Sequence, residues 1–220
     1  MLQRHRVGSV VAEFLGTATL ALVAIGATKY FNFTAPWYVG LAVGVTLAAL
    51  VGIIGKASGA HVNPAITVGL LTLRKISPIK SVVYITAQLL GGLTAFMLVE
   101  YITNSDIVSA GSSTFDTRIF VAEVMGSAVF AFGVASVVMQ KIEGMQAAFT
   151  IGTSLFMGVL IASLVAPGFI NPAVALANNA WGITTVLAPL MGSVIGMNVY
   201  SFFLAPEKSL IISKPKKNKK

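Results

Sequence analysis

The sequence contains no cysteine, only two histidines and few charged residues, which make up 10% of its 220 positions. Without cysteine there are no disulfides and no thiolate or cysteine-metal chemistry, and His5 and His61 cannot by themselves build a histidine metal site. Soluble domains carry about 25% charged residues, whereas this chain is 56% hydrophobic with a mean hydropathy of +0.87. We therefore expect an integral membrane protein that is not an enzyme and that uses no metal or cofactor.

The net charge of +8 would suit a nucleic-acid-binding protein, but its placement argues against one. Six of the fifteen basic residues lie between positions 208 and 220, after the last apolar segment. Such a run is typical of a solvated tail on the cytoplasmic side of a membrane. We expect residues 207–220 to form a basic, disordered cytoplasmic tail, and we expect no nucleic-acid partner.

Six apolar stretches are long enough to cross a lipid bilayer, at about 20 residues each. They run roughly over residues 7–28, 36–55, 81–102, 118–139, 145–165 and 184–204, and two further stretches, 64–73 and 172–180, are about half as long. With the N-terminus inside, thirteen of the fifteen basic residues fall on the cytoplasmic side. Because basic residues concentrate there, we expect both termini to be cytoplasmic, in a multi-pass protein of the cell membrane.

The chain repeats internally. Residues 11–21 align with residues 121–131 with six identities, and the tripeptide Asn-Pro-Ala occurs at 63–65 and again at 171–173. Each half therefore holds three spans and one half-length helix, and because three is odd the second half crosses the membrane in the opposite direction. We predict an all-α membrane protein with six transmembrane helices and two re-entrant half-helices. It forms one domain over residues 1–206, an inverted repeat of about 7–103 and 117–205.

Each Asn-Pro-Ala motif reads as the start of a half-helix, because asparagine caps helices and proline suits their first position. The residues that open the two half-helices are Pro64, Ala65, Pro172 and Ala173. By the symmetry of the repeat the two N-termini meet near the midplane, and each carries about half a positive charge. We expect them to exclude cations, and we expect Asn63 and Asn171 to keep both amide N–H groups free for a neutral solute.

The loops before the motifs must satisfy their backbone groups inside the membrane, which is tolerated where they line a cavity. We expect carbonyl groups of these loops to line the path of the solute, at Gly59, Ala60, His61, Val62, Phe169 and Ile170.

Glu13 and Glu123 occupy matching positions in the repeat, and carboxylates inside a membrane are costly enough to need a reason. We interpret them as braces that accept backbone N–H groups from the loop of their own half. A proton relay is the alternative, which would make the protein a proton-coupled secondary transporter. Solute flux that responds to a pH gradient would distinguish the two.

With these motifs the chain resembles the aquaporin, or major intrinsic protein, family over nearly its whole length. The matching segments are residues 12–17, 58–65, 87–92 and 171–173. The resemblance implies a channel protomer with its own pore, usually assembled as a homotetramer in the bilayer. It also implies passive passage of water or small uncharged solutes.

The chain departs from the family where the pore is expected to be narrowest. In the family the second motif is normally followed by an arginine that lines the outer constriction, and here that position is Val174. Counted from the motifs, the other constriction positions look like Val43, Val159 and Gly168, where water-selective members usually have an aromatic residue and a histidine at the two helix positions.

Counting without gaps locates a constriction residue only to within about one helical position. Three neighbours therefore stay open as alternatives: Gly44, Gly158 and Leu160. Three valines and a glycine predict a wide, apolar constriction that passes glycerol-like solutes. An apolar ring can also dewet, which would make the protein a poor water channel.

Overall fold

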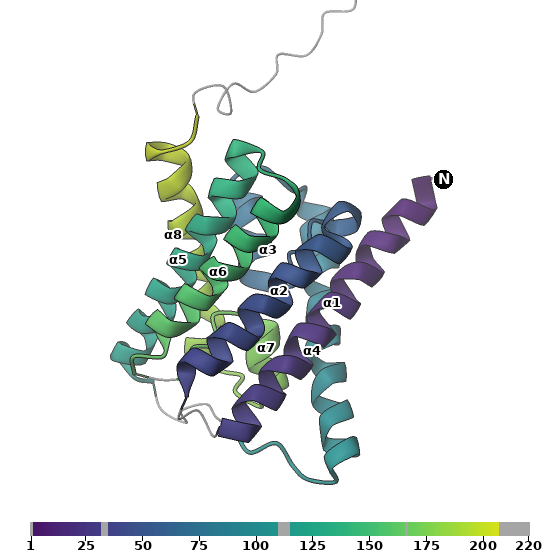
Figure 1. Cartoon of the computed structure of the whole chain (residues 1–220), viewed down its shortest axis with the longest axis vertical. Helices are drawn as coiled ribbons and strands as arrows, with labels where there is room; N and C mark the ends of the chain where they lie inside the picture. The colour runs from purple at the N-terminus through teal and green to yellow at the C-terminus, as the bar shows by residue number, and fades with distance from the viewer. Residues whose placement is uncertain (1, 32–34, 110–114, 166, 207–220) are drawn as a thin grey trace, which may run out of the picture.

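The computed structural model describes residues 2–31, 35–109, 115–165 and 167–206, and every regular element in these ranges is a helix. Within them, six helices are long and apolar enough to span a membrane: α1 (Leu2–Phe31), α2 (Pro36–Ser58), α4 (Pro78–Thr103), α5 (Thr117–Gln140), α6 (Gly144–Ala162) and α8 (Ile183–Phe203). Two are short, α3 (Pro64–Thr72) and α7 (Pro172–Ala177). The six spans and two half-length helices confirm the predicted fold class (Figure 1). The predicted tail, residues 207–220, lies outside the described residues.

The observed helix ends differ from the expected ones by a few residues. Helix α1 begins at Leu2, so the basic residues before Val7 belong to the same helix, and α6 ends at Ala162, three residues early. Helix α7 ends at Ala177 instead of position 180, because Asn179 adopts a left-handed conformation with φ 53° and stops the helix.

The helix starts follow local sequence rules. Proline, which lacks an N–H that the first turn does not need, occupies the first position of four helices: Pro36, Pro64, Pro78 and Pro172. Asp116 caps α5, where its Oδ1 accepts a hydrogen bond from Arg118 N at 2.8 Å. The Arg118 side chain also donates to this carboxylate and lowers the pKa of Asp116 to about 2. A charged cap therefore marks the start of α5.

The two halves fold alike. In the first half α1 packs on α2 and α4, and in the second half α5 packs on α6 and α8. Gly91 of α4 lies so close to α1 that a Cβ there would sit 2.5 Å from Phe14 O. Gly192 of α8 makes the same approach to α5, where its Cβ would sit 2.3 Å from Val124 O. Phe14 and Val124 are related by the 110-residue offset of the repeat, so this helix crossing is duplicated.

The half-helices cross between the halves. Helix α3 packs on α8, and α7 packs on α4, while α2 and α6 pack against each other. In Figure 1 α3 lies in the upper part of the molecule and α7 in the lower part. The start of α1 and the end of α8 lie on the same side, which we call the terminal face; the other side is the opposite face. The crossed half-helices place both Asn-Pro-Ala motifs inside the protein.

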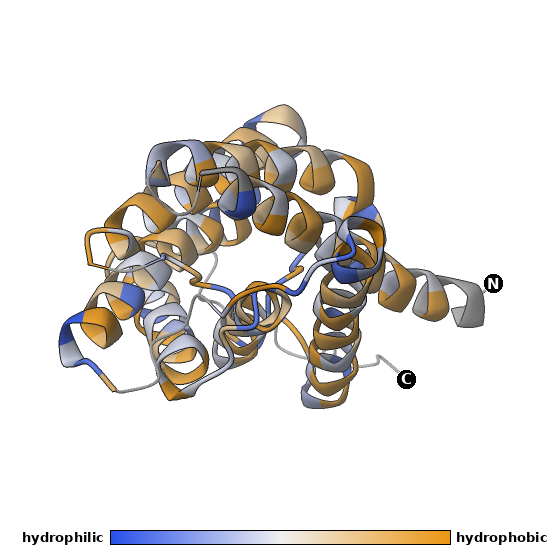
Figure 2. Ribbon diagram, turned by 90° about the horizontal axis from the view of Figure 1, so that it is seen from below, coloured by the Kyte–Doolittle hydropathy of each residue, from blue (hydrophilic) through white to orange (hydrophobic). Residues whose placement is uncertain are grey.

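The outer surface is suited to lipid. Hydrophobic residues cover much of the outer helices in Figure 2, and large apolar side chains are strongly exposed along them, among them Ile53, Met145 and Phe202. A soluble monomer rarely exposes apolar surface on this scale. The six spans and this surface make the chain an integral, multi-pass membrane protein.

Candidate functional site

Each Asn-Pro-Ala asparagine caps its own half-helix. Asn63 Oδ1 accepts a hydrogen bond from Ala65 N at 2.8 Å, at the start of α3. Asn171 Oδ1 accepts one from Ala173 N at 3.0 Å, at the start of α7. Because the oxygen of each amide faces its helix, the nitrogen faces away from it. Both asparagines are buried.

The amide nitrogens bind the opposite half of the protein. Asn63 Nδ2 donates to the carbonyl oxygen of Ile170 at 3.0 Å, and Asn171 Nδ2 donates to the carbonyl oxygen of Val62 at 2.9 Å. These bonds correct the expectation that both N–H groups of each amide stay free, because one of the two is used. The reason is that Val62 and Ile170 are fully buried, and a buried carbonyl needs a donor. The second N–H of each amide has no acceptor among the described residues, and its use by a solute stays a prediction.

The glutamates of the repeat hold the loops from the other side. Glu13 accepts hydrogen bonds from His61 N at 3.0 Å and from Val62 N at 2.7 Å. Glu123 accepts them from Phe169 N and Ile170 N, both at 2.8 Å. Both carboxylates are completely buried. Each one therefore binds two successive backbone N–H groups of the loop in its own half.

Two strained residues lie between these contacts. Val62 (φ 41°) and Ile170 (φ 26°) adopt left-handed conformations that β-branched residues rarely occupy. Such a conformation costs about 1–3 kcal/mol and persists only where the surroundings enforce it. Here each residue is held at its N–H by the glutamate of its own half and at its carbonyl by the asparagine of the other half.

We expected the carbonyls of several loop residues to line a path, but the structure places these residues in different surroundings. The carbonyls of Val62 and Ile170 accept the asparagine hydrogen bonds, and Phe169 lies on the wall of a cavity described below. Gly59, Ala60 and His61 lie in the loop between α2 and α3. Ala60 is left-handed, with φ 50°, and its N–H donates to the hydroxyl of Ser58 at 3.0 Å. A path along these carbonyls stays a prediction.

Glu13 has a further partner in Gln88, which connects it to other polar side chains. Gln88 Nε2 donates to Glu13 at 2.7 Å and lies 3.0 Å from the hydroxyl oxygen of Thr67. The Nδ1 atom of His61 lies 3.1 Å from the same hydroxyl. The loop before α3 is therefore embedded in a polar network that also includes α4.

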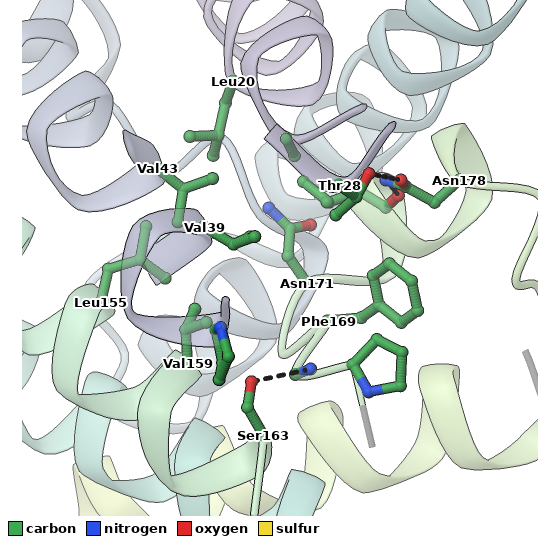
Figure 3. Close-up of a pocket in the computed structure, with 15 residues that line it drawn as sticks. Leu20, Thr28, Val39, Val43, Leu155, Val159, Ser163, Phe169, Asn171 and Asn178 are labelled. Carbon is green, nitrogen blue, oxygen red and sulfur yellow. Dashed lines mark hydrogen bonds between the residues drawn. The ribbon is translucent and has the colours of Figure 1, made fainter. Parts of the chain in front are cut away.

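A cavity of about 250 Å³ opens beside Asn171. Its walls come from α1, α2, α6, α7 and the loop before α7 (Figure 3). Eleven of its fifteen lining residues are apolar or glycine, and the four with polar side chains are Thr28, Ser163, Asn171 and Asn178. The cavity can therefore contact the C–H groups of a small molecule over most of its wall and bind oxygen or nitrogen atoms at a few places.

All four residues predicted for the constriction lie on this wall: Val43, Val159, Gly168 and Val174. Two neighbours that counting left open point elsewhere. A Cβ on Gly44 would sit 2.7 Å from Gly152 O in α6, and one on Gly158 would sit 2.6 Å from Gly126 O in α5. Leu160 is not among the lining residues. The role of the four residues as a constriction stays a prediction.

Sequence reasoning missed several residues of the cavity wall, among them Leu20, Thr28, Leu155, Ser163 and Asn178. Asn178 follows Asn171 by seven residues, so helical spacing along α7 could have identified it. Nothing in the sequence signals Thr28, whose hydroxyl donates to a side chain 150 residues away, that of Asn178.

Comparison with known proteins gives consistent matches. The family model described as Major intrinsic protein matches residues 2–204. Aquaporin-1 of Rattus norvegicus is 30% identical over 227 residues, covering 91% of this chain and 83% of that protein. Aquaporin FA-CHIP of Pelophylax lessonae is 29% identical over 228 residues, covering 91% and 84%. The solved aquaglyceroporin from Plasmodium falciparum matches with a TM-score of 0.75 at 24% identity, over 90% of this chain and 96% of that one, which supports the fold.

Proposed function

The chain belongs to the major intrinsic protein family, and we propose that it is a passive membrane channel for water and small uncharged solutes such as glycerol. One observation carries this proposal: the capped N-termini of two half-helices are joined by reciprocal asparagine hydrogen bonds, beside a largely apolar cavity. The helix ends supply a barrier to cations, and the cavity supplies room and contacts for a neutral molecule.

The barrier follows from helix electrostatics. Helices α3 and α7 present their N-termini to one another, and each end carries about half a positive charge. Cations, including hydronium, are repelled there. Asn63 and Asn171 each keep one amide N–H after the cross-half bonds are counted. A water or hydroxyl oxygen therefore accepts from these donors, and the oxygen of the solute turns toward the asparagines.

The outer constriction is apolar and carries no charge. Val43, Val159 and Val174 with Gly168 occupy the wall where the family has an arginine. A cavity of about 250 Å³ has room for several water molecules, each of which takes about 30 Å³ in the liquid. This size and chemistry favour passage of a molecule with both C–H and O–H groups, such as glycerol, over a filter for water alone.

The alternative of a proton-coupled transporter is less well supported. It needs Glu13 and Glu123 to exchange protons with a solute pathway. Both carboxylates are completely buried, neither lines the cavity beside Asn171, and both accept hydrogen bonds from loop N–H groups. These contacts favour the role of braces.

Stopped-flow measurements on proteoliposomes test the proposal. We expect water permeability above that of empty vesicles, and re-swelling in an inward glycerol gradient at a rate that a pH gradient does not change. Water flux without glycerol flux would contradict the broad, glycerol-like pore. The absence of both would contradict the channel, and flux that follows a pH gradient would support the transporter.

The topology and assembly are also proposals. We place both termini in the cytoplasm and the protein in the cell membrane, because basic residues lie at the helix ends of the terminal face, as positive-inside topology requires. They are Lys56 near the end of α2, Arg74 and Lys75 between α3 and α4, Lys80 near the start of α4, and Lys141 after α5. We propose a homotetramer with one pore per chain, as is usual in the family. Labelling of the termini in intact and permeabilised cells tests the first proposal, and native mass spectrometry tests the second.

A further inference from the structure

Asn178 lines the same cavity as two residues of the proposed pore. Asn171 is the N-cap of α7, Asn178 is its C-cap, and Val174 lies about one helical turn before Asn178. All three line the cavity (Figure 3). Asn178 caps the C-terminal end of α7 and is only 2% exposed, so its amide is inside the protein.

Hydrogen bonds fix the orientation of this amide. Asn178 Nδ2 donates to the carbonyl oxygen of Val174 at 2.9 Å. Its Oδ1 lies 3.0 Å from the hydroxyl of Thr28, whose single proton it shares with Ile25 O, also at 3.0 Å. The reverse orientation would place Oδ1 against the Val174 carbonyl, where two acceptors repel. In the described part of the chain the amide nitrogen has no second acceptor. A buried N–H group normally has one, so a water or solute oxygen in the cavity is suited to supply it.

The polar groups of the cavity occupy distinct places. Asn171 marks the inner end of the cavity, where α7 begins, and Asn178 with Thr28 marks the end of α7. Helix α7 lies in the part of the molecule toward the opposite face (Figure 1). The 6 residues of α7 lie between the two asparagines, a helix length of about 9 Å. Val174 lies between them. A solute that enters therefore meets an amide donor, then apolar wall, then a second amide donor.

We propose that Asn178, positioned by Thr28, is a specificity-determining residue of the pore. Its second N–H binds an oxygen of the entering solute and compensates for water that the solute loses against the valine wall. Small polyhydroxylated molecules gain most, because one hydroxyl binds at Asn178 while their C–H groups contact Val174. This inference rests on the proposed function, and it names small polyols as the favoured class.

The substitution Asn178→Ser tests the proposal. A serine hydroxyl can donate to the carbonyl four residues earlier, as Ser154 does to Thr150 O at 2.7 Å, so the cap of α7 is kept while the second donor is lost. One hydrogen bond of ordinary strength corresponds to about a threefold to tenfold change in rate. We expect the ratio of glycerol to water permeability in proteoliposomes to fall by about this factor, although the smaller side chain widens the cavity.

Three further variants complete the experiment. Asn198→Ser is the control, because Asn198 also donates to a carbonyl four residues earlier, Val194 O at 2.8 Å, but is exposed on α8, away from the cavity. Its amide nitrogen also donates to Thr72 Oγ1 at 2.8 Å, so this variant loses a second bond outside the cavity, and its ratio should equal that of the wild type. Asn178→Leu keeps the branched shape of the side chain but removes both hydrogen-bonding groups, and it should lower the ratio too. Thr28→Val removes the hydroxyl beside Asn178 Oδ1, while the Val174 carbonyl still binds Nδ2. It should therefore lower the ratio by less, and it decides the question if both Asn178 variants fail to fold.

The outcomes separate this inference from the proposed function. If the wild type conducts neither water nor glycerol, the channel itself is contradicted. If the wild type conducts glycerol and the folded Asn178→Ser variant keeps or raises the glycerol-to-water ratio, the channel stands and the role of Asn178 is overturned. A fall in the ratio in the Asn178 variants but not in Asn198→Ser supports it.

Discussion

Replacing Glu123 with glutamine should release the loop before α7. The two carboxylate oxygens of Glu123 accept from Phe169 N and Ile170 N, both at 2.8 Å, and the side chain is completely buried. Glutamine has the same shape, but one oxygen becomes an NH₂ group. One backbone N–H then faces another donor instead of an acceptor, in a fully buried place.

The size of the effect follows from these contacts. Hydrogen bonds to a charged group contribute about 1.5–3 kcal/mol, and a buried donor left without an acceptor costs about 1–3 kcal/mol. Because one bond is lost and the other is weakened, we expect the free energy of unfolding to fall by about 2–5 kcal/mol. At about 2–4 °C per kcal/mol for a chain of this length, the melting temperature should fall by about 4–20 °C.

The assay is thermal unfolding in detergent, followed by tryptophan fluorescence, with Glu100→Gln as the matched control. Glu100 also accepts from a backbone N–H, that of Ile107 at 3.1 Å, but with one oxygen on a partly exposed side chain. Glutamine can keep that bond, so the control should change stability by less than about 0.5 kcal/mol. If Glu123→Gln melts no earlier than Glu100→Gln, the carboxylate does not hold the loop. Unchanged stability with loss of a pH-driven flux would favour the proton relay instead.

Three further substitutions test other parts of the pore. Val174→Arg should lower glycerol permeability more than water permeability in swelling assays, because a long cationic side chain fills the apolar cavity; unchanged flux would place the constriction elsewhere. Gly168→Ala should destabilise the protein by about 1–3 kcal/mol, because its Cβ would lie 2.7 Å from Val159 O, whereas Gly26→Ala, with open space around it, should be neutral or stabilising in the same melting assay. Asn171→Asp should lose about 1–3 kcal/mol, because an oxygen then faces the carbonyl that the amide now binds, and an unchanged melting temperature would show that this bond contributes little.

The fold could be predicted because its main signals are local or repeated. Apolar length alone identifies the six spans, and Asn-Pro-Ala supplies both a cap and a helix start at Asn63 and again at Asn171. The duplicated segment around Glu13 and Glu123 relates the two halves. The family prediction from these motifs is confirmed by the family model and by the aquaporin relatives.

The parts that sequence reasoning missed depend on how distant segments meet. Asn63 and Ile170 are 107 residues apart, and no local pattern indicates that one amide N–H of Asn63 binds the Ile170 carbonyl. The pairing of Thr28 with Asn178 spans 150 residues. Both bonds depend on the position of one half against the other, which is set by the packing of α3 on α8 and of α7 on α4. Symmetry predicts that the helix ends face each other, but not which hydrogen bonds their side chains make.

The two halves have the same arrangement of helices, but they differ in the side chains around the matched glutamates. In the first half Glu13 is joined by Gln88, and Gln88 contacts Thr67. In sequence register, the two motifs match Ala175 with Thr67, and the matched glycines of α4 and α8 match Pro189 with Gln88.

Glu123 accordingly binds its loop with two backbone bonds and no side-chain donor in the described residues. The bonds that both halves keep, from glutamate to loop and from asparagine to the opposite carbonyl, hold the strained residues Val62 and Ile170. Because these shared bonds are needed for the architecture itself, they leave little freedom for selectivity. If the proposed roles hold, selectivity depends on the apolar wall around Val174 and on the amide of Asn178, which line the cavity beside Asn171.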